Sequence, residues 1–115
     1  MKSHMKYNPE DVYVKGTLHV SNGTSALMLL DKDGTPMARA TANLEDDIDD
    51  DIVYIKDYAE NKGVYKTLTE GNIVEATGNT YSKHYETHSV MFFEARIIDS
   101  DVLKEISEAR ERIKK

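Results

Sequence analysis

Alternating apolar and polar positions run through the first third of the chain and predict β-strands. The first alternating segment has its apolar side chains at Val12, Val14, Leu18 and Val20. Asn22-Gly23 follows, and apolar residues resume at 26–30. Asn-Gly favours a two-residue type I′ turn, because both central residues of that turn need positive φ. The pattern therefore predicts a β-hairpin.

A second turn at 31–34, with the sequence DKDG, leads into a third strand within residues 35–44. In this strand Met37, Arg39 and Thr41 alternate with Ala38, Ala40 and Ala42. Pro36 donates no N–H to a ladder, so it must lie at the start of the strand or on a sheet edge.

The middle of the chain predicts a short strand at 51–56 and a helix at 57–71. Asp57 is placed to cap the helix, with Glu60 three residues later as in a capping box, and Gly71 provides a left-handed stop. Gly63 would lie inside this helix and weaken it by about 1 kcal/mol relative to alanine. One side of the helix should therefore be well packed.

Residues 72–98 predict two further strands with a turn near 83–86. The segment 99–115 predicts an amphipathic helix with a Ser100 cap, acidic residues in its first turn and basic residues in its last turn. Its apolar positions fall at helical spacing. They are Val102, Ile106, Ala109 and Ile113.

These elements, in the order βββ-β-α-ββ-α, predict an α+β domain built on a mostly antiparallel sheet. We expect a flexible N-terminus at 1–11, a single domain at 12–98 and a C-terminal helix at 99–115, which packs on the domain or mediates self-association. The start MKSHM contains the His-Met pair that a common cloning site encodes. Whether residues 1–4 are native is therefore left open.

Charge is unevenly distributed along the chain. The net charge is −6, and residues 44–60 alone carry eight Asp/Glu against one Lys. The rest of the chain is nearly neutral, so a general affinity for nucleic acid or for an anionic membrane has no electrostatic basis in the sequence. A charged partner is expected to be a protein with a basic surface.

Other compositional features point to a cytoplasmic protein. The chain has no cysteine, which excludes disulfides and thiolate chemistry and suits a reducing compartment. No apolar run approaches the roughly 18 residues of a membrane helix, and the first residues lack the order of a secretion signal.

The acidic run within 44–52 admits three interpretations: a solvated loop, a weak divalent-metal site, or a surface that binds a basic cleft of another protein. An EF-hand at DKDG is excluded, because Ala40 stands where the final glutamate would be. The candidate partner-binding residues are Glu45, Asp46, Asp47, Asp49, Asp50 and Asp51, with Ile48 as an apolar anchor.

A second candidate metal set consists of His84, Glu86 and His88, which would share one face of a strand. The alternative is a polar exposed turn. The tyrosines could form a nucleic-acid platform, but no basic groove accompanies them in the sequence, so packing roles are expected. Phosphate-binding, hydrolase-elbow and metalloprotease motifs are all missing, so we expect neither an enzyme nor a cofactor.

One stretch resembles a known family. The segment VYIKDYAENKGVYKTLTEGNIVEATGNTYS, together with LMLLDKDGTPMARATANL before it, is similar to a family of small uncharacterised proteins carried by bacterial plasmids, conjugative elements and phages. The likeness covers roughly residues 12–97 and implies a compact domain in a mobile-element setting. It transfers no catalytic residue. The acidic run is longer than the family pattern, and the helix from Asp99 lies beyond its usual end.

The sequence therefore favours a non-enzymatic accessory protein of a mobile genetic element that binds another protein through its acidic loop. The alternative is a weak divalent-metal-binding module. The identity of the partner, the host and the oligomeric state, monomer or homodimer through the C-terminal helix, are left open by the sequence.

Overall fold

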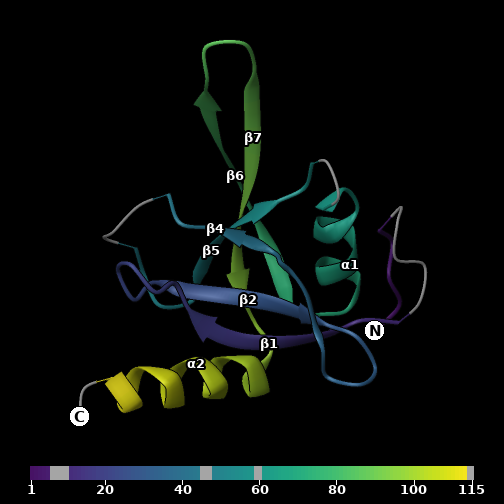
Figure 1. The fold of residues 1–115 in the computed structure, drawn as a ribbon, viewed down its shortest axis with the longest axis vertical. Helices are drawn as coiled ribbons and strands as arrows, with labels where there is room; N and C mark the ends of the chain where they lie inside the picture. Colours follow the sequence, from purple (N-terminus) through teal and green to yellow (C-terminus); the bar gives the residue numbers. More distant parts are fainter. Residues whose placement is uncertain (6–10, 45–47, 59–60, 114–115) are drawn as a thin grey trace.

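The computed structural model describes residues 1–5, 11–44, 48–58 and 61–113 and confirms the α+β class with antiparallel sheets (Figure 1). One sheet has the order β1-β2-β3 and the other β4-β5-β7-β6. The strands are β1 (Tyr13–Leu18), β2 (Ser25–Leu30), β3 (Pro36–Arg39), β4 (Thr41–Ala42), β5 (Ile52–Lys56), β6 (Val74–His84) and β7 (Ser89–Ile97). The helices are α1 (Val64–Glu70) and α2 (Ser100–Ile113).

The predicted third strand is divided between the two sheets at Ala40. Pro36 begins β3, an edge strand, as its missing N–H requires. The N–H of Ala40 donates to the carbonyl of Leu27 in β2, and its carbonyl accepts from the N–H of Lys56 in β5, both at 2.9 Å. Ala40 is completely buried. One small residue therefore joins both sheets.

A single core connects the two sheets and both helices. Its members come from β2, β5, β6, β7, α1 and α2, and apolar burial of this extent is the main stabilising term for a domain of this size. The largest fully buried side chains in it include Leu27, Leu29, Ile55, Leu68, Ile97, Val53, Val64 and Val74.

The first hairpin forms, but the predicted two-residue type I′ turn is wrong. The connection from β1 to β2 spans residues 19–24, and the N–H of Gly23 donates to the carbonyl of His19 at 2.8 Å. Gly23 has φ of 74°, whereas Asn22 is not among the described residues with positive φ. The longer loop therefore needs only the glycine in the left-handed region.

The helix expected at 57–71 is shorter than predicted. Its N-cap is Gly63, with φ of 100°, so Gly63 precedes the helix and does not weaken it. Asp57 still caps it, because Oδ1 accepts from the N–H groups of Gly63 and Tyr65 at 2.9 and 3.1 Å. The left-handed residue at the end is Asn72, with φ of 58°, and not Gly71. Glu60 lies outside the described residues.

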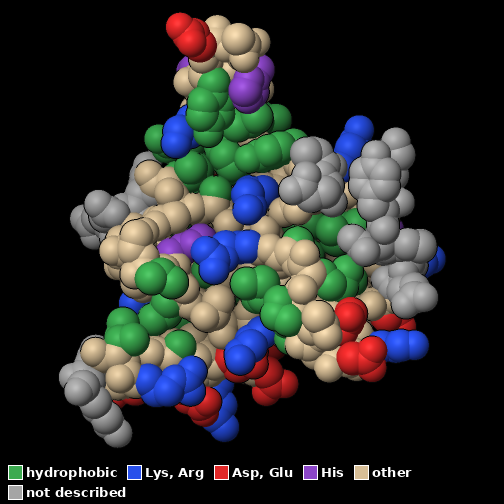
Figure 2. Space-filling model, viewed as in Figure 1, with side chains coloured by type: hydrophobic (Ala, Val, Ile, Leu, Met, Phe, Trp, Pro, Cys, Tyr) green, Lys and Arg blue, Asp and Glu red, His purple; other side chains and the backbone are tan. Residues whose placement is uncertain are grey.

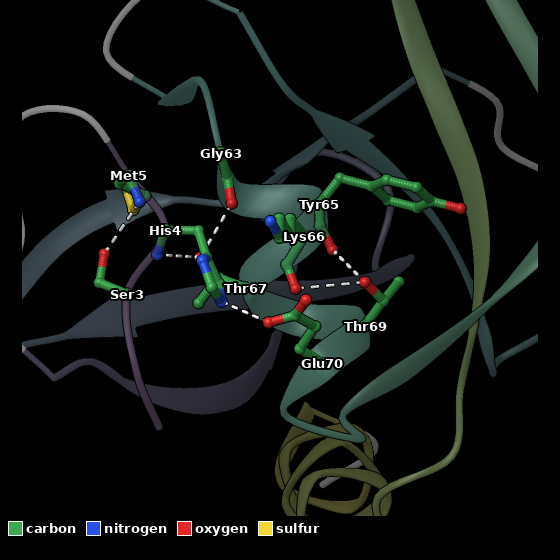
Figure 3. A network of polar contacts seen from close by, with 9 residues as sticks. All are labelled: Ser3, His4, Met5, Gly63, Tyr65, Lys66, Thr67, Thr69 and Glu70. Atoms are coloured by element: carbon green, nitrogen blue, oxygen red, sulfur yellow. Dashed lines mark hydrogen bonds and ion pairs between the residues drawn. The ribbon is translucent and has the colours of Figure 1, made fainter.

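The described part of the N-terminal segment, residues 1–5, packs against α1 (Figure 3). The N–H of His4 donates to Thr67 Oγ1 at 2.8 Å, and Thr67 Oγ1 donates to the carbonyl of Gly63. The His4 ring pairs with Glu70, and the side chain of Met5 is buried. A Cβ at Gly63 would collide with the backbone carbonyl of His4. The packing of residues 1–5 against α1 therefore requires glycine at this position.

Helix α2 lies along β1, so its apolar stripe is covered within the same chain (Figure 1). Val102 and Ile106 are buried, whereas Ile113 is exposed. Asp99, and not the predicted Ser100, caps the helix: its Oδ1 accepts from the N–H of Val102 at 3.0 Å. On β1, the N–H of Gly16 donates to Glu105 Oε1 at 3.1 Å.

Replacing Gly16 by alanine tests this packing. A Cβ at Gly16 would stand 2.5 Å from the carbonyl oxygen of Val102 and 2.8 Å from Ile106 Cγ1, so α2 must move away from β1. We expect Gly16→Ala to lower the free energy of unfolding by about 1–3 kcal/mol, measured by urea denaturation. Gly34→Ala measures backbone strain without a steric clash, because its added Cβ meets no atom within 4 Å but its φ is 81°. Equal stability of Gly16→Ala and the native chain would contradict the packing.

Candidate functional site

The acidic run is only partly described, and its described end contacts two arginines. Glu45, Asp46 and Asp47 lie outside the described residues. Asp51 Oδ2 lies 2.7 Å from Arg96 Nη1, and Asp50 Oδ1 lies 3.3 Å from Arg110 Nη2. The side chain of Asp50 is nevertheless 75% exposed, and Asp49 is exposed. The charge of Asp51 is therefore neutralised by an arginine, and that of Asp50 is neutralised in part.

Arg110 fixes this end of the acidic run to α2 and to the first hairpin. Its Nη1 donates to the carbonyl of Gly23 at 2.9 Å, and its Nη2 donates to Ser25 Oγ at 3.3 Å. Ser25 Oγ in turn donates to the carbonyl of Asp50. One guanidinium thus joins three segments that are distant in the sequence, which gives the acidic run a defined anchor at Asp50.

The second candidate metal set is not brought together. His84 ends β6, whereas Glu86 and His88 lie in the turn, where the N–H of Tyr85 donates to the carbonyl of His88 at 2.7 Å. The strand alternation that would align the three side chains therefore stops at His84. Among the described residues, no group of three or more His, Asp or Glu side chains is arranged to hold a metal ion.

Basic side chains from three segments gather where β3, β4 and β5 meet. We call His19, Arg39 and Lys56 the basic cluster. His19 Nε2 lies 3.3 Å from Thr41 Oγ1, and Arg39 is separated from Thr41 only by Ala40. The backbone N–H of Lys56 bonds to Ala40. Figure 2 shows Lys and Arg side chains beside a His side chain in the middle of the viewed face.

Arg39 carries the most informative feature of the cluster. Its Nε atom is buried and has no hydrogen-bond partner among the described residues, while its backbone carbonyl accepts from Asn61 Nδ2 at 2.9 Å. A buried donor without an acceptor costs free energy, and nearly all such groups in proteins are paired. This donor is in addition part of a permanently charged group. The arrangement fits an anion that supplies the acceptor.

The surroundings of His19 are electropositive. Burial lowers the pKa of His19 below its ordinary value of 6.5, and the positive charges of Arg39 and Lys56 lower the pKa further. The ring is therefore held neutral at physiological pH. Both cations therefore lie close enough to His19 to act on its ring.

The acidic run and the basic cluster lie at opposite ends of the β4–β5 pair. Thr41 is the register partner of Ile55 and Ala42 of Tyr54, so the connection 43–51 leaves from the end away from Lys56. With about 3.3 Å per strand residue, Ile52 and Lys56 are roughly 13 Å apart. The described acids that precede β5, Asp49 to Asp51, thus lie at the end of this strand away from Lys56.

An aromatic surface adjoins the basic cluster on the second sheet. Lys56 is the register partner of Phe92, and Phe92 is the partner of Tyr81, so the three side chains share a face. The Tyr58 ring meets Phe92 edge-on, with ring centres 5.8 Å apart, and the Tyr54 ring lies 5.7 Å from Tyr81. On the opposite, core-facing side of this sheet, Tyr65 stacks on Phe93 at 4.5 Å.

A separate hollow of about 580 Å³ lies between the 19–24 loop and the C-terminal end of α2. Its lining includes His19, Asn22, Arg112 and Ile113. The described helices lack a span of sufficient length and apolarity to cross a membrane.

No family model matches the chain, and neither a curated protein nor a solved structure does.

Sequence reasoning missed the basic cluster, because its members are far apart in the chain and none belongs to a charged run. Lys56 lies in the acidic stretch, and His19 is a single histidine among alternating apolar and polar positions. The sole local signal was Arg39, a cation at an otherwise apolar strand junction with alanine on both sides. Only the strand register places the three together.

The pH dependence of stability tests the burial of His19. The unfolded chain has a His pKa near 6.5, whereas the folded pKa is lower, so the unfolded state binds the proton first as the pH falls. The free energy of unfolding should therefore be largest above pH 6.5 and decrease from there down to the folded pKa. Urea denaturation at a series of pH values measures this.

His19→Gln should flatten this decrease. His84→Gln, at an exposed position on the hairpin tip, should retain the native profile. Identical profiles for His19→Gln and the native protein would refute the burial of a neutral ring.

Proposed function

We propose that this protein is a non-enzymatic binding protein whose ligand is an anionic group held by the basic cluster. The observation that carries the proposal is the buried Nε of Arg39, which lacks an acceptor. A phosphate or similar oxyanion supplies acceptor oxygens with the geometry of the guanidinium fork. Charge-assisted bonds of this kind are about twice as strong as neutral ones.

The neighbours of Arg39 support an anion over a neutral ligand. Lys56 adds a second permanent charge, and neutral His19 offers a ring nitrogen beside Thr41 without adding repulsion. The nearest acid in the sequence, Asp57, is occupied as the cap of α1.

A second candidate function is binding of a basic protein through the acidic run. The observation that favours it is the exposure of Asp49 and of Asp50, the latter held in place by Arg110. The resemblance of the central segment to proteins of plasmids, conjugative elements and phages suggests an accessory role in a mobile element. We propose a cytoplasmic setting for both functions.

Arg39→Met tests the anion site, because methionine keeps much of the aliphatic bulk and removes the donors. Titration with inorganic phosphate, followed by the amide and His19 ring NMR signals, should show saturable binding to the native protein. Bound anion adds negative charge near His19 and should raise the pKa of that ring. Arg39→Met should lose both effects.

The same variant should be at least as stable as the native chain in phosphate-free buffer, by up to about 1 kcal/mol, since a buried unpaired donor is removed. Arg96→Met is the matched control: it removes the partner of Asp51 and should leave phosphate binding unchanged. Marked destabilisation of Arg39→Met, together with unaltered phosphate binding, would overturn the proposal.

The acidic-run candidate is tested by changing Asp46, Asp47, Asp49 and Asp50 to asparagine and leaving Asp51 with its arginine. Proteins captured from a host extract at low salt should be lost with this variant, because the contact depends on weakly screened charge. The control replaces Asp101 and Glu108, two exposed acids of α2, by their amides. Equal capture by native and loop variants would dismiss this candidate.

A further inference from the structure

We infer that the anionic ligand is a single-stranded nucleic acid, with a backbone phosphate at the basic cluster and unpaired bases on the adjoining aromatic surface. This inference rests on the proposed anion site and names its ligand class. It reverses the expectation, drawn from net charge alone, that the chain does not contact nucleic acid.

The first step is the continuity between the cluster and the aromatic rings. Lys56 belongs to both: it acts on His19, and its register partner is Phe92. With about 4.8 Å between neighbouring strands, Tyr81 on β6 lies about 10 Å from Lys56 across β7. A phosphate bound at Lys56 would therefore lie one strand from the ring of Phe92 and two strands from the ring of Tyr81.

The second step is that one ring is partly exposed. Tyr58 is 38% exposed, and its ring meets Phe92 edge-on. Phe92 and Tyr54 are buried and support Tyr58 and Tyr81 from below. A rigidly supported, half-exposed ring is the element on which a base stacks.

The β6–β7 hairpin extends this surface away from the body of the protein (Figure 1). Figure 2 shows hydrophobic side chains along the hairpin, above the basic side chains of the viewed face. At the tip, Tyr85 is 46% exposed and stacks on His88 with ring centres 4.9 Å apart. Lys83 Nζ lies 5.7 Å from the centre of the Tyr85 ring. The tip thus repeats the pairing of a cation with an aromatic ring.

This combination of groups selects a single strand over other anions. Tyrosine rings stack on bases only where those bases are unpaired. A duplex therefore presents no base faces on which these rings could stack. A sulfated polysaccharide or an anionic membrane would use the cations but not the exposed faces of the rings. The strand register places both kinds of group on one face, which a pure phosphate site does not require.

The acidic run does not oppose binding at this face. It leaves the β4–β5 pair at the end remote from Lys56, and Asp51 and Asp50 are paired with Arg96 and Arg110. At physiological salt, exposed charges more than about 8 Å apart are largely screened.

The experiment is a fluorescence anisotropy titration of labelled oligothymidylate with the native protein and two variants. Tyr58→Leu should weaken binding by roughly 5- to 150-fold, the loss of one stacked base. Arg39→Gln should weaken binding and reduce the slope of log K against log salt by about 0.7, the share of one phosphate contact.

Matched controls separate these effects from general damage. Tyr13→Leu removes a tyrosine that is 51% exposed on β1, and Arg112→Gln removes an exposed arginine of α2. Both should bind oligothymidylate as the native protein does. Thermal unfolding of each variant verifies that it is folded.

Further ligands identify which proposal fails. Inorganic phosphate binding that is retained in Tyr58→Leu but lost in Arg39→Gln supports the assigned roles. Phosphate binding without oligothymidylate binding would overturn the nucleic-acid inference and leave the anion site standing. Absence of both would overturn both. Equal affinity for heparin, for anionic vesicles or for the duplex with oligoadenylate would also overturn the inference, because none of these presents unpaired bases.

Discussion

The two backbone hydrogen bonds of Ala40 are the constraint on which the rest of the structure depends. One joins it to Leu27 in the first sheet and the other to Lys56 in the second. A residue that pairs with both sheets must be small, because no space remains around it, and Ala40 is completely buried. The junction places Arg39 at the end of β3 and Lys56 at the end of β5, so both cations meet near His19 because of the topology alone.

The acidic run is anchored at the other end of the β4–β5 pair, where Asp50 contacts Arg110. Arg110 binds the first hairpin and Asp50, and it reaches both because α2 packs closely on β1, where Gly16 provides the space. The anchoring of the acidic run therefore depends on the docking of α2. The 19–24 loop belongs to both surfaces, because His19 is part of the basic cluster and Gly23 accepts from Arg110.

The sequence predicted the element order, the start of β3 at Pro36 and the C-terminal helix, because local periodicity and proline chemistry decide these. It mispredicted the ends of α1 and the first turn. There Gly63 lies against the chain at His4 and Gly23 closes a longer loop, contacts that no local pattern encodes. The basic cluster could not be predicted from the sequence for a related reason. Its residues become neighbours only through strand register, which is a long-range property.

The energetics of the cluster also argue for a ligand. Without an anion, the fold leaves a buried guanidinium donor unpaired and lowers the pKa of a buried imidazole beside two cations. The unpaired donor costs stability at any pH and the lowered pKa costs stability below about pH 6.5, while a core of this size has only a modest surplus. Selection for stability alone could remove this cost by a single substitution, since methionine at position 39 would have no buried donor. Features that oppose folding and lie on one open face are typical of groups arranged for binding. An anion placed there would supply an acceptor to Arg39 and offset the positive charges of Arg39 and Lys56.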